Sequence, residues 1–163
     1  MLSTSPAQIA SLYSYPVKGL SPEALPSVAL KAGQTFPADR DYAIENGPGG
    51  FDPAAPVWRP KSNYLMLMRN ERLAELQTQF EDSSHLLTIR QSGKVTAQGN
   101  LETTDGRNTI EAFFTAHFAS ELKGPPKILS GGNHSFSDVA RKVISIINLG
   151  SLKAIENMVN LPV

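Results

Sequence analysis

The chain has 163 residues, of which 40% are hydrophobic and 18% charged, so we expect a soluble globular protein with one domain, or one domain and part of another. Its 15 basic side chains balance 15 acidic ones and form no basic run, which argues against nucleic-acid binding. The absence of cysteine excludes disulfides, thiolate metal sites and cysteine nucleophiles, and it fits a reducing compartment.

The N-terminal sequence carries no targeting signal. Residues 1–10, MLSTSPAQIA, lack the basic and apolar regions of a signal peptide. No apolar run in the sequence approaches the roughly 20 residues needed to cross a bilayer. We therefore expect a cytoplasmic protein that does not contact membranes.

Three short strands are predicted in the first third of the chain. Residues 7–15 and 24–30 are rich in aliphatic and aromatic residues, and residues 40–45 alternate polar and apolar residues before an Asn-Gly turn pair. Residues 46–61 contain four prolines and three glycines, which predicts a long loop. Loops of this length are usually either functional or disordered.

The middle of the chain predicts a helix, a hairpin and a second helix. Asn70 is placed to cap the first helix. Its apolar face consists of Leu73, Leu76 and Phe80. Residues 85–91 and 94–99 predict two strands joined by a Ser-Gly turn. The second helix spans residues 104–119, and its apolar stripe consists of Ile110, Phe113, Phe114 and Phe118.

The last part of the chain predicts a strand and a helix after an irregular stretch. Residues 124–137 contain turn residues on both sides of a short apolar piece at 127–129. Residues 143–147 predict a buried strand, and a turn at Gly150 leads into a helix. The apolar side of that helix consists of Leu152, Ile155 and Val159. The elements together predict an α+β, mainly β fold: an antiparallel β-barrel or sheet with two or three added helices, then the start of a second unit.

Two cations are candidates for binding an anion. Lys18 follows Pro16, which restrains the backbone, and precedes Gly19, which permits a bend. A constrained ammonium at the mouth of a sheet suits an anion, although residue type alone favours a solvated turn lysine. Arg40 lies between two aspartates, and its planar fork matches carboxylate or phosphate. A surface pair with one of those aspartates is the simpler interpretation.

Weaker candidates lie in the loops and at the last helix. Trp58 and Arg59 could form the wall of a pocket or, more simply, pin the loop to the core. The glycine-rich residues 130–135 could offer backbone amides to an anion, but they lack the lysine of a P-loop. Ser151 either caps the helix or shares an anion site at its N-terminus. The sequence contains no recognisable catalytic triad, carboxylate pair or histidine spacing for zinc.

Several of these segments, taken together, resemble one family. YPVKGL (15–20) followed by DRDYAI (39–44) is similar to the N-terminal β-barrel domain of MOSC proteins, which are named for the C-terminal domain of molybdenum cofactor sulfurases. WRPKSNYLMLMR (58–69) takes the place of the family's aromatic or arginine-bearing strand. Residues 134–158 resemble the opening of the MOSC domain, whereas residues 71–127 add only a compatible length.

The resemblance implies an N-terminal MOSC β-barrel domain over residues 1–130 and the beginning of a truncated MOSC domain over 131–163. The family includes reductases of N-hydroxylated compounds, which use a molybdenum–molybdopterin cofactor, and sulfur-handling domains. It implies that Lys18 and Arg40 hold the phosphate and pterin end of this cofactor. Gly19 stands where these reductases often have serine, which removes one side-chain hydrogen bond. The other cofactor-binding residues that we expect are Gly19, Arg59, Asn148 and Ser151.

The family's metal-ligating or sulfur-accepting cysteine has no counterpart here. We expect no catalytic and no metal-ligating residue in this chain. Three interpretations of the missing cysteine stay open. The chain is a fragment of a longer protein, a short family member without metal chemistry, or a relative that keeps only the fold. The predicted function is to bind the anionic pterin cofactor within a reductase or sulfur-transfer enzyme that also meets a redox partner protein. The alternative is a non-enzymatic docking module for sulfur or cofactor delivery or for a protein partner.

Overall fold

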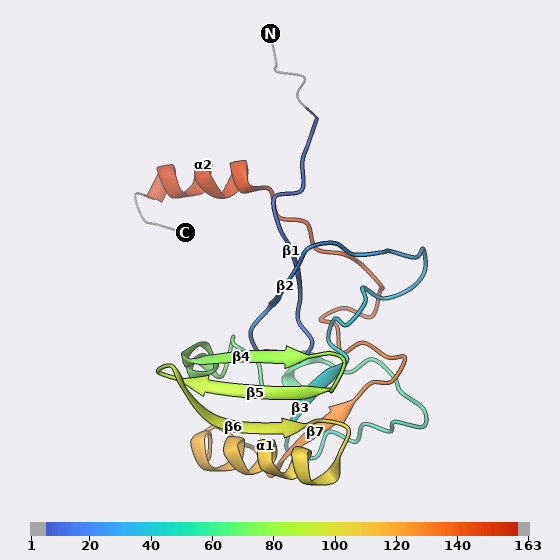
Figure 1. The fold of residues 1–163 in the computed structure, drawn as a ribbon, viewed down its shortest axis with the longest axis vertical. Helices are drawn as coiled ribbons and strands as arrows, with labels where there is room; N and C mark the ends of the chain where they lie inside the picture. Colours follow the sequence, from blue (N-terminus) through green and yellow to red (C-terminus); the bar gives the residue numbers. More distant parts are fainter. Residues whose placement is uncertain (1–5, 160–163) are drawn as a thin grey trace.

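The structure, a computed structural model, describes residues 6–159. In chain order its elements are β1 (Leu12–Ser14), β2 (Glu23–Leu25), β3 (Tyr42–Asn46), the 3-10 helices η1 (Lys61–Asn63) and η2 (Glu71–Glu75), β4 (Leu76–Glu81), β5 (Leu86–Gln91), β6 (Lys94–Asn100), α1 (Thr104–His117), β7 (Pro126–Ser130) and α2 (Leu149–Val159) (Figure 1). The strands form three antiparallel sheets, β1-β2, β3-β7 and β4-β5-β6. The predicted α+β, mainly β class is therefore confirmed.

The main core lies between the three-stranded sheet and α1, which runs along β6 (Figure 1). The predicted helix over 104–119 is confirmed and ends at His117. Its first turn is capped by Thr103, whose side chain accepts a hydrogen bond from the backbone N–H of Gly106. The side chains buried between helix and sheet include Leu87, Ile89, Ile110, Phe113 and Phe114.

The predicted hairpin is also confirmed. Ser92 and Gly93 connect β5 to β6 with φ angles of 51° and 77°. Two consecutive left-handed residues give the turn that matches the twist of an antiparallel pair. The hairpin was predictable because its turn residues and the residue pattern of its two strands all lie within one short segment.

The predicted helix after Asn70 is wrong. Only η2 is helical, and the chain continues as β4, which pairs antiparallel with β5. Leu76 and Phe80 are four residues apart, a spacing that places two side chains on one face in a strand as well as in a helix. The backbone hydrogen bonds to β5 decide that this segment is a strand and not a helix, and β5 lies outside the segment itself.

A second sheet places β3 beside β7. All five residues of β3 are buried, and Ile44 is opposite Ile128. The apolar piece at 127–129, which the sequence left inside an irregular stretch, is thus a strand. β3 begins at Tyr42, two residues later than predicted, because Arg40 is left-handed with a φ of 57°. A small second core on this sheet consists of Ala43, Tyr64, Leu129 and Phe136.

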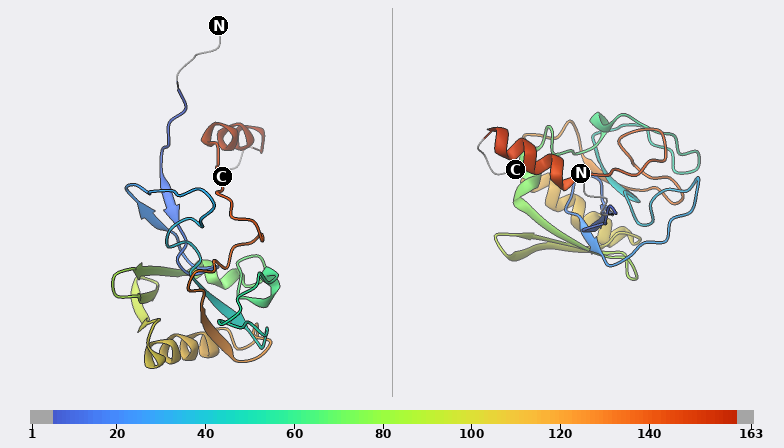
Figure 2. Two further views of the ribbon diagram at one scale, coloured as in Figure 1. Left: turned by 90° about the vertical axis from the view of Figure 1, so that its right-hand side faces the viewer. Right: turned by 90° about the horizontal axis from the view of Figure 1, so that it is seen from above.

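The β1-β2 ribbon and α2 extend away from the body that contains the main core (Figure 2). The buried strand predicted over residues 143–147 is wrong. No strand is assigned there, and the side chains of Val143, Ile144, Ile146 and Ile147 are 50–91% exposed. An extended segment becomes a strand only beside another strand that pairs with its backbone. The predicted turn at Gly150 is also wrong, since α2 already begins at Leu149.

Within residues 6–159, none of the helices combines the length and the apolar character that a membrane crossing requires.

Candidate functional site

Backbone pairing brings the YPVK and DRDY segments side by side. The backbone N–H of Arg40 donates to the carbonyl of Tyr15 at 2.7 Å, and that of Lys18 donates to the carbonyl of Tyr42 at 2.9 Å. Val17 and Tyr42 form a parallel bridge. Lys18 and Arg40 therefore project from adjacent stretches of backbone although 22 positions separate them in the sequence.

The Lys18 side chain is almost fully buried, at 4% exposure, and not solvated as its residue type suggested. Its ammonium donates to the carbonyl of Phe136 at 2.9 Å and forms an ion pair with Asp138. It also lies 5.8 Å from the centre of the Tyr64 ring. The site thus holds a desolvated ammonium whose carboxylate partner, among the residues that the structure describes, is Asp138.

Burial lowers the pKa of Lys18, and the bond to Asp138 opposes this effect. The charges of Arg40 and Lys61 lower it further. For Asp138, burial favours a higher pKa, but the Lys18 hydrogen bond and the charges of Lys18, Arg40 and Lys61 outweigh it and lower the pKa of this carboxyl. Three cations therefore act on one carboxylate.

Gly19 has a structural role beside the cation. Its φ is +83°, a conformation that residues with a side chain rarely adopt. A Cβ at this position would lie 2.8 Å from the backbone carbonyl oxygen of Leu65. This backbone therefore has no room for a side chain at position 19, and Gly19 contributes the turn that follows Lys18.

Arg40 is held from two sides. Its guanidinium pairs with Asp39 and lies 5.4 Å from the centre of the Tyr15 ring. The pairing with a neighbouring aspartate matches the simpler interpretation of its sequence. The backbone carbonyl of Arg40 also accepts a hydrogen bond from the N–H of Phe136, at 2.8 Å. Arg40 is 28% exposed and so stays accessible to solvent.

Two members of this site were not singled out in the sequence. Lys61 begins η1, directly after the proline-rich loop, and Asp138 belongs to the chain after β7. Neither residue lies in a local motif, because Asp138 contacts Lys18, and the charge of Lys61 acts on it, only through the tertiary fold. We call Lys18, Arg40, Lys61 and Asp138 the cation site.

Arg59 and Trp58 support the proline-rich loop. Trp58 donates from its indole nitrogen to the carbonyl of Ser137 at 3.2 Å, which agrees with the pinning interpretation. Arg59 donates to the carbonyl of Gly50 at 2.9 Å, within the same loop. The buried Nε of Arg59 has no hydrogen-bond partner among the residues that the structure describes. Its cofactor-binding role stays a prediction.

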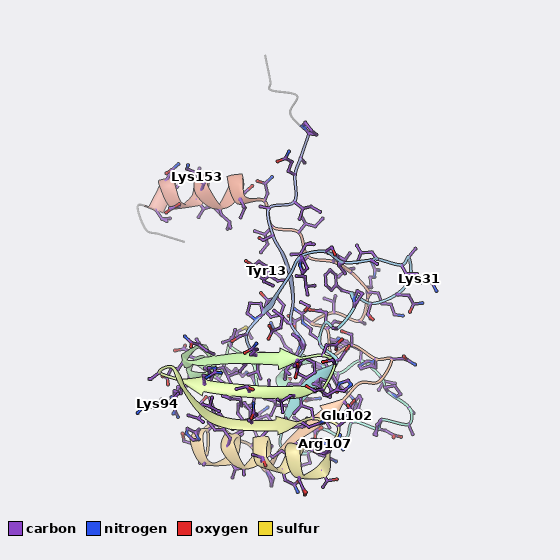
Figure 3. The ribbon with its side chains drawn as sticks, viewed as in Figure 1. Tyr13, Lys31, Lys94, Glu102, Arg107 and Lys153 are labelled. Carbon is purple, nitrogen blue, oxygen red and sulfur yellow. The ribbon has the colours of Figure 1, made fainter. Side chains whose placement is uncertain are left out.

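The structure does not bring Asn148 and Ser151 to the cation site. The side-chain oxygen of Asn148 accepts hydrogen bonds from the backbone N–H groups of Gly150 and Ser151, at 2.8 and 3.2 Å. Asn148, and not Ser151, thus caps α2. Figure 3 shows α2, on which Lys153 is labelled, apart from the sheets of the main body. Their predicted role in binding the cofactor stays a prediction.

A polar cluster forms around the hydroxyl of Tyr42, the first residue of β3. The hydroxyl of Tyr42 is hydrogen-bonded to Nδ1 of His85 at 2.9 Å and to the carboxylate of Glu102.

Burial, together with the charges of Asp82 and Asp39, raises the pKa of Asp41 to about 6. Among the described residues, no group of three or more histidine, aspartate or glutamate side chains could hold a metal ion.

A family model described as the MOSC N-terminal beta barrel domain matches residues 6–124, which is more than half of the chain. The chain belongs to this family. No curated protein and no solved structure gave a match. Within the MOSC match lie Lys18, Gly19, Arg40, Arg59 and Lys61. Asp138, Asn148 and Ser151 lie outside it.

Proposed function

We propose that the cation site of this MOSC N-terminal domain binds the phosphate-bearing, anionic end of a molybdenum–molybdopterin cofactor. The observation that supports this proposal is the buried Lys18 ammonium, paired with Asp138, beside the backbone of Arg40, with the charges of Arg40 and Lys61 also acting on the Asp138 carboxyl. These three cations are accompanied by two paired carboxylates, those of Asp138 and Asp39, so that one positive charge is left over. An anion with several oxygens matches such a set better than one carboxylate does.

Each cation has a distinct part in the proposed binding. The buried Lys18 ammonium supplies a point charge in surroundings where water screens it weakly. Arg40 presents a planar fork for two phosphate oxygens once it turns from Asp39. Lys61, which is exposed on η1, attracts the anion from solvent.

The residues fit the anionic end of the cofactor and not its metal. When bound, the cofactor would supply oxygen- or electron-transfer chemistry at molybdenum. A thiolate ligand for that metal is not available, because the sequence contains no cysteine. We therefore assign no catalytic residue to this chain and propose that it contributes cofactor binding to a reductase or sulfur-transfer protein.

The two-part organisation belongs to the same proposal. We place the boundary near Ser130, where β7 ends, with the N-terminal domain before it and the first part of a MOSC domain after it. Asn148 and Ser151 would then face the cofactor from the second part. Both residues are exposed, Asn148 directly before α2 and Ser151 in its first turn, and are accessible to an anion.

A docking module for sulfur or cofactor delivery, or for a protein partner, is the second candidate function. The observation that favours it is the exposure of the apolar residues between 143 and 159. The most exposed of them are Ile146, Ile147, Met158 and Val143. Such apolar surface is typical of a protein that binds another macromolecule.

A titration followed by backbone amide NMR shifts tests the proposed function. The purified chain is titrated with inorganic phosphate and, separately, with a molybdopterin-type ligand. We expect shifts near Lys18, Arg40 and Lys61 with both ligands and tighter binding of the pterin compound. Equal affinity would indicate a general phosphate site, and no shift near these residues would overturn cofactor binding and favour the docking function.

A further inference from the structure

The chain after β7 folds back onto the backbone of the cation site. The N–H of Gly131 donates to the carbonyl of Asp41 at 2.7 Å, and the hydroxyl of Ser135 donates to the carbonyl of Asp39 at 2.8 Å. The side chain of Phe136 is 2% exposed and packs against Tyr64. Residues 131–136 are therefore anchored by backbone pairing and by the second core.

Asp138, two residues beyond this anchor, is held differently. Its side chain is 58% exposed, yet its carboxylate pairs with the buried ammonium of Lys18. The carboxylate can leave Lys18 by a rotation of its own side chain, while Phe136 stays buried and keeps its carbonyl on the same ammonium. Of the two hydrogen bonds that the Lys18 ammonium donates, the one to the Asp138 carboxylate can therefore be exchanged for a bond to another anion.

We propose that Asp138 is an internal competitor for the anion, so that an incoming phosphate must displace its carboxylate from Lys18. This inference rests on the proposed function and adds to it that Asp138 controls how tightly the site binds an anion. Lys18 is 4% exposed, and the Asp138 carboxylate covers its charged end. A phosphate that approached without displacement would bring a second negative charge next to that carboxylate, and like charges at such short range repel each other.

The chain on both sides of Asp138 has attachments that do not involve its carboxylate. The Ser137 carbonyl accepts from Trp58, and the ammonium of Lys142 donates to the carbonyl of Gly33 at 3.1 Å. These two bonds lie on either side of Asp138 and the exposed residues that follow it. They hold the backbone near Asp138 in place when its carboxylate turns away from Lys18.

The test compares phosphate binding by the full chain with that of two variants. Asp138→Asn keeps the size of the side chain and removes the competing charge. Asp52→Asn controls for the change in net charge, since Asp52 is also an exposed loop aspartate and its carboxylate accepts a hydrogen bond from the N–H of Ala54. We expect Asp138→Asn to bind phosphate about tenfold more tightly, since a hydrogen-bonded charge pair no longer competes, and Asp52→Asn to match the wild type.

A second measurement follows the Asp138 carboxyl carbon by NMR as pH is varied. Displacement predicts that the pKa of Asp138 rises when phosphate is added, because Lys18 no longer stabilises its charged form. Equal phosphate binding by wild type and Asp138→Asn, or weaker binding by the variant, would overturn the competitor role and leave the cation site intact. If neither protein binds phosphate near Lys18, the proposed function itself fails.

Discussion

The Lys18 ammonium and the Asp138 carboxylate, 120 positions apart in the sequence, form an ion pair in which the cation is buried and the anion is half exposed. This asymmetry means that the anion can be exchanged while the cation stays in place. A pair buried on both sides would resist such exchange, because each charge would remain without a partner in a dry interior.

Replacement of Lys18 by alanine is expected to weaken phosphate binding by at least about tenfold, since a charged hydrogen-bond donor is lost. The fold should remain, with a change of less than about 2 kcal/mol in unfolding free energy, because the removed ammonium also carried a desolvation cost. Binding is measured by the NMR titration and stability by urea unfolding. Lys94→Ala, at the exposed hairpin end labelled in Figure 3, should bind as the wild type does. Unfolding of the Lys18→Ala protein would show that Lys18 is structural.

Gly19→Ala and Gly93→Ala form a matched pair, because both glycines have a φ near +80°, at 83° and 77°. A Cβ at Gly19 meets the Leu65 carbonyl oxygen at 2.8 Å, whereas at Gly93 it meets nothing within 4 Å. We expect Gly93→Ala to cost about 1 kcal/mol of unfolding free energy and Gly19→Ala about 2–4 kcal/mol. Thermal and urea unfolding measure both. Equal losses would mean that the chain near Leu65 moves to accept the methyl group.

The raised pKa of Asp41 predicts a pH-dependent stability. Its ordinary pKa of 3.8 rises to about 6 in the folded chain, so the folded state binds the proton more tightly than the unfolded state. Its contribution to stability is present below about pH 4 and is lost as pH rises through about 6. Asp41→Asn, which cannot ionise, should therefore be more stable than the wild type at pH 7, by about 1–2 kcal/mol, and not at pH 4. Unfolding curves at the two pH values check this, with Asp52→Asn as control. A stability difference that does not change with pH would contradict it.

Trp58 offers a probe of the cation site, since it is the only tryptophan in the chain and donates to the Ser137 carbonyl, next to Asp138. If phosphate displaces Asp138, the surroundings of the indole change and its fluorescence emission should shift during the titration. Lys18→Ala should remove most of this shift. A shift of the same size in that variant would place the responding anion elsewhere.

The fold was predictable where its determinants are local. The cap at Thr103 and the apolar stripe of α1 lie within one segment, as do the alternation of β5 and β6 and their Ser-Gly turn. The spacing of Leu76 and Phe80 fitted both helix and strand, so β4 depended on a neighbour that the segment does not contain. The apolar residues 143–147 predicted a buried strand, but no adjacent strand pairs with them in the structure.

The sequence by itself determined which residues are candidates for binding an anion. These are a constrained Lys18 and an arginine in the DRDY segment, and both lie in motifs that resemble MOSC proteins. Only the tertiary structure decided that these two cations project from paired stretches of backbone, that the charge of Lys61 also acts there, and that Asp138 is the ion-pair partner of Lys18. The physical reason is that charge interactions depend on distance in space and on burial. Both are set here by backbone pairing between segments that are far apart in the chain.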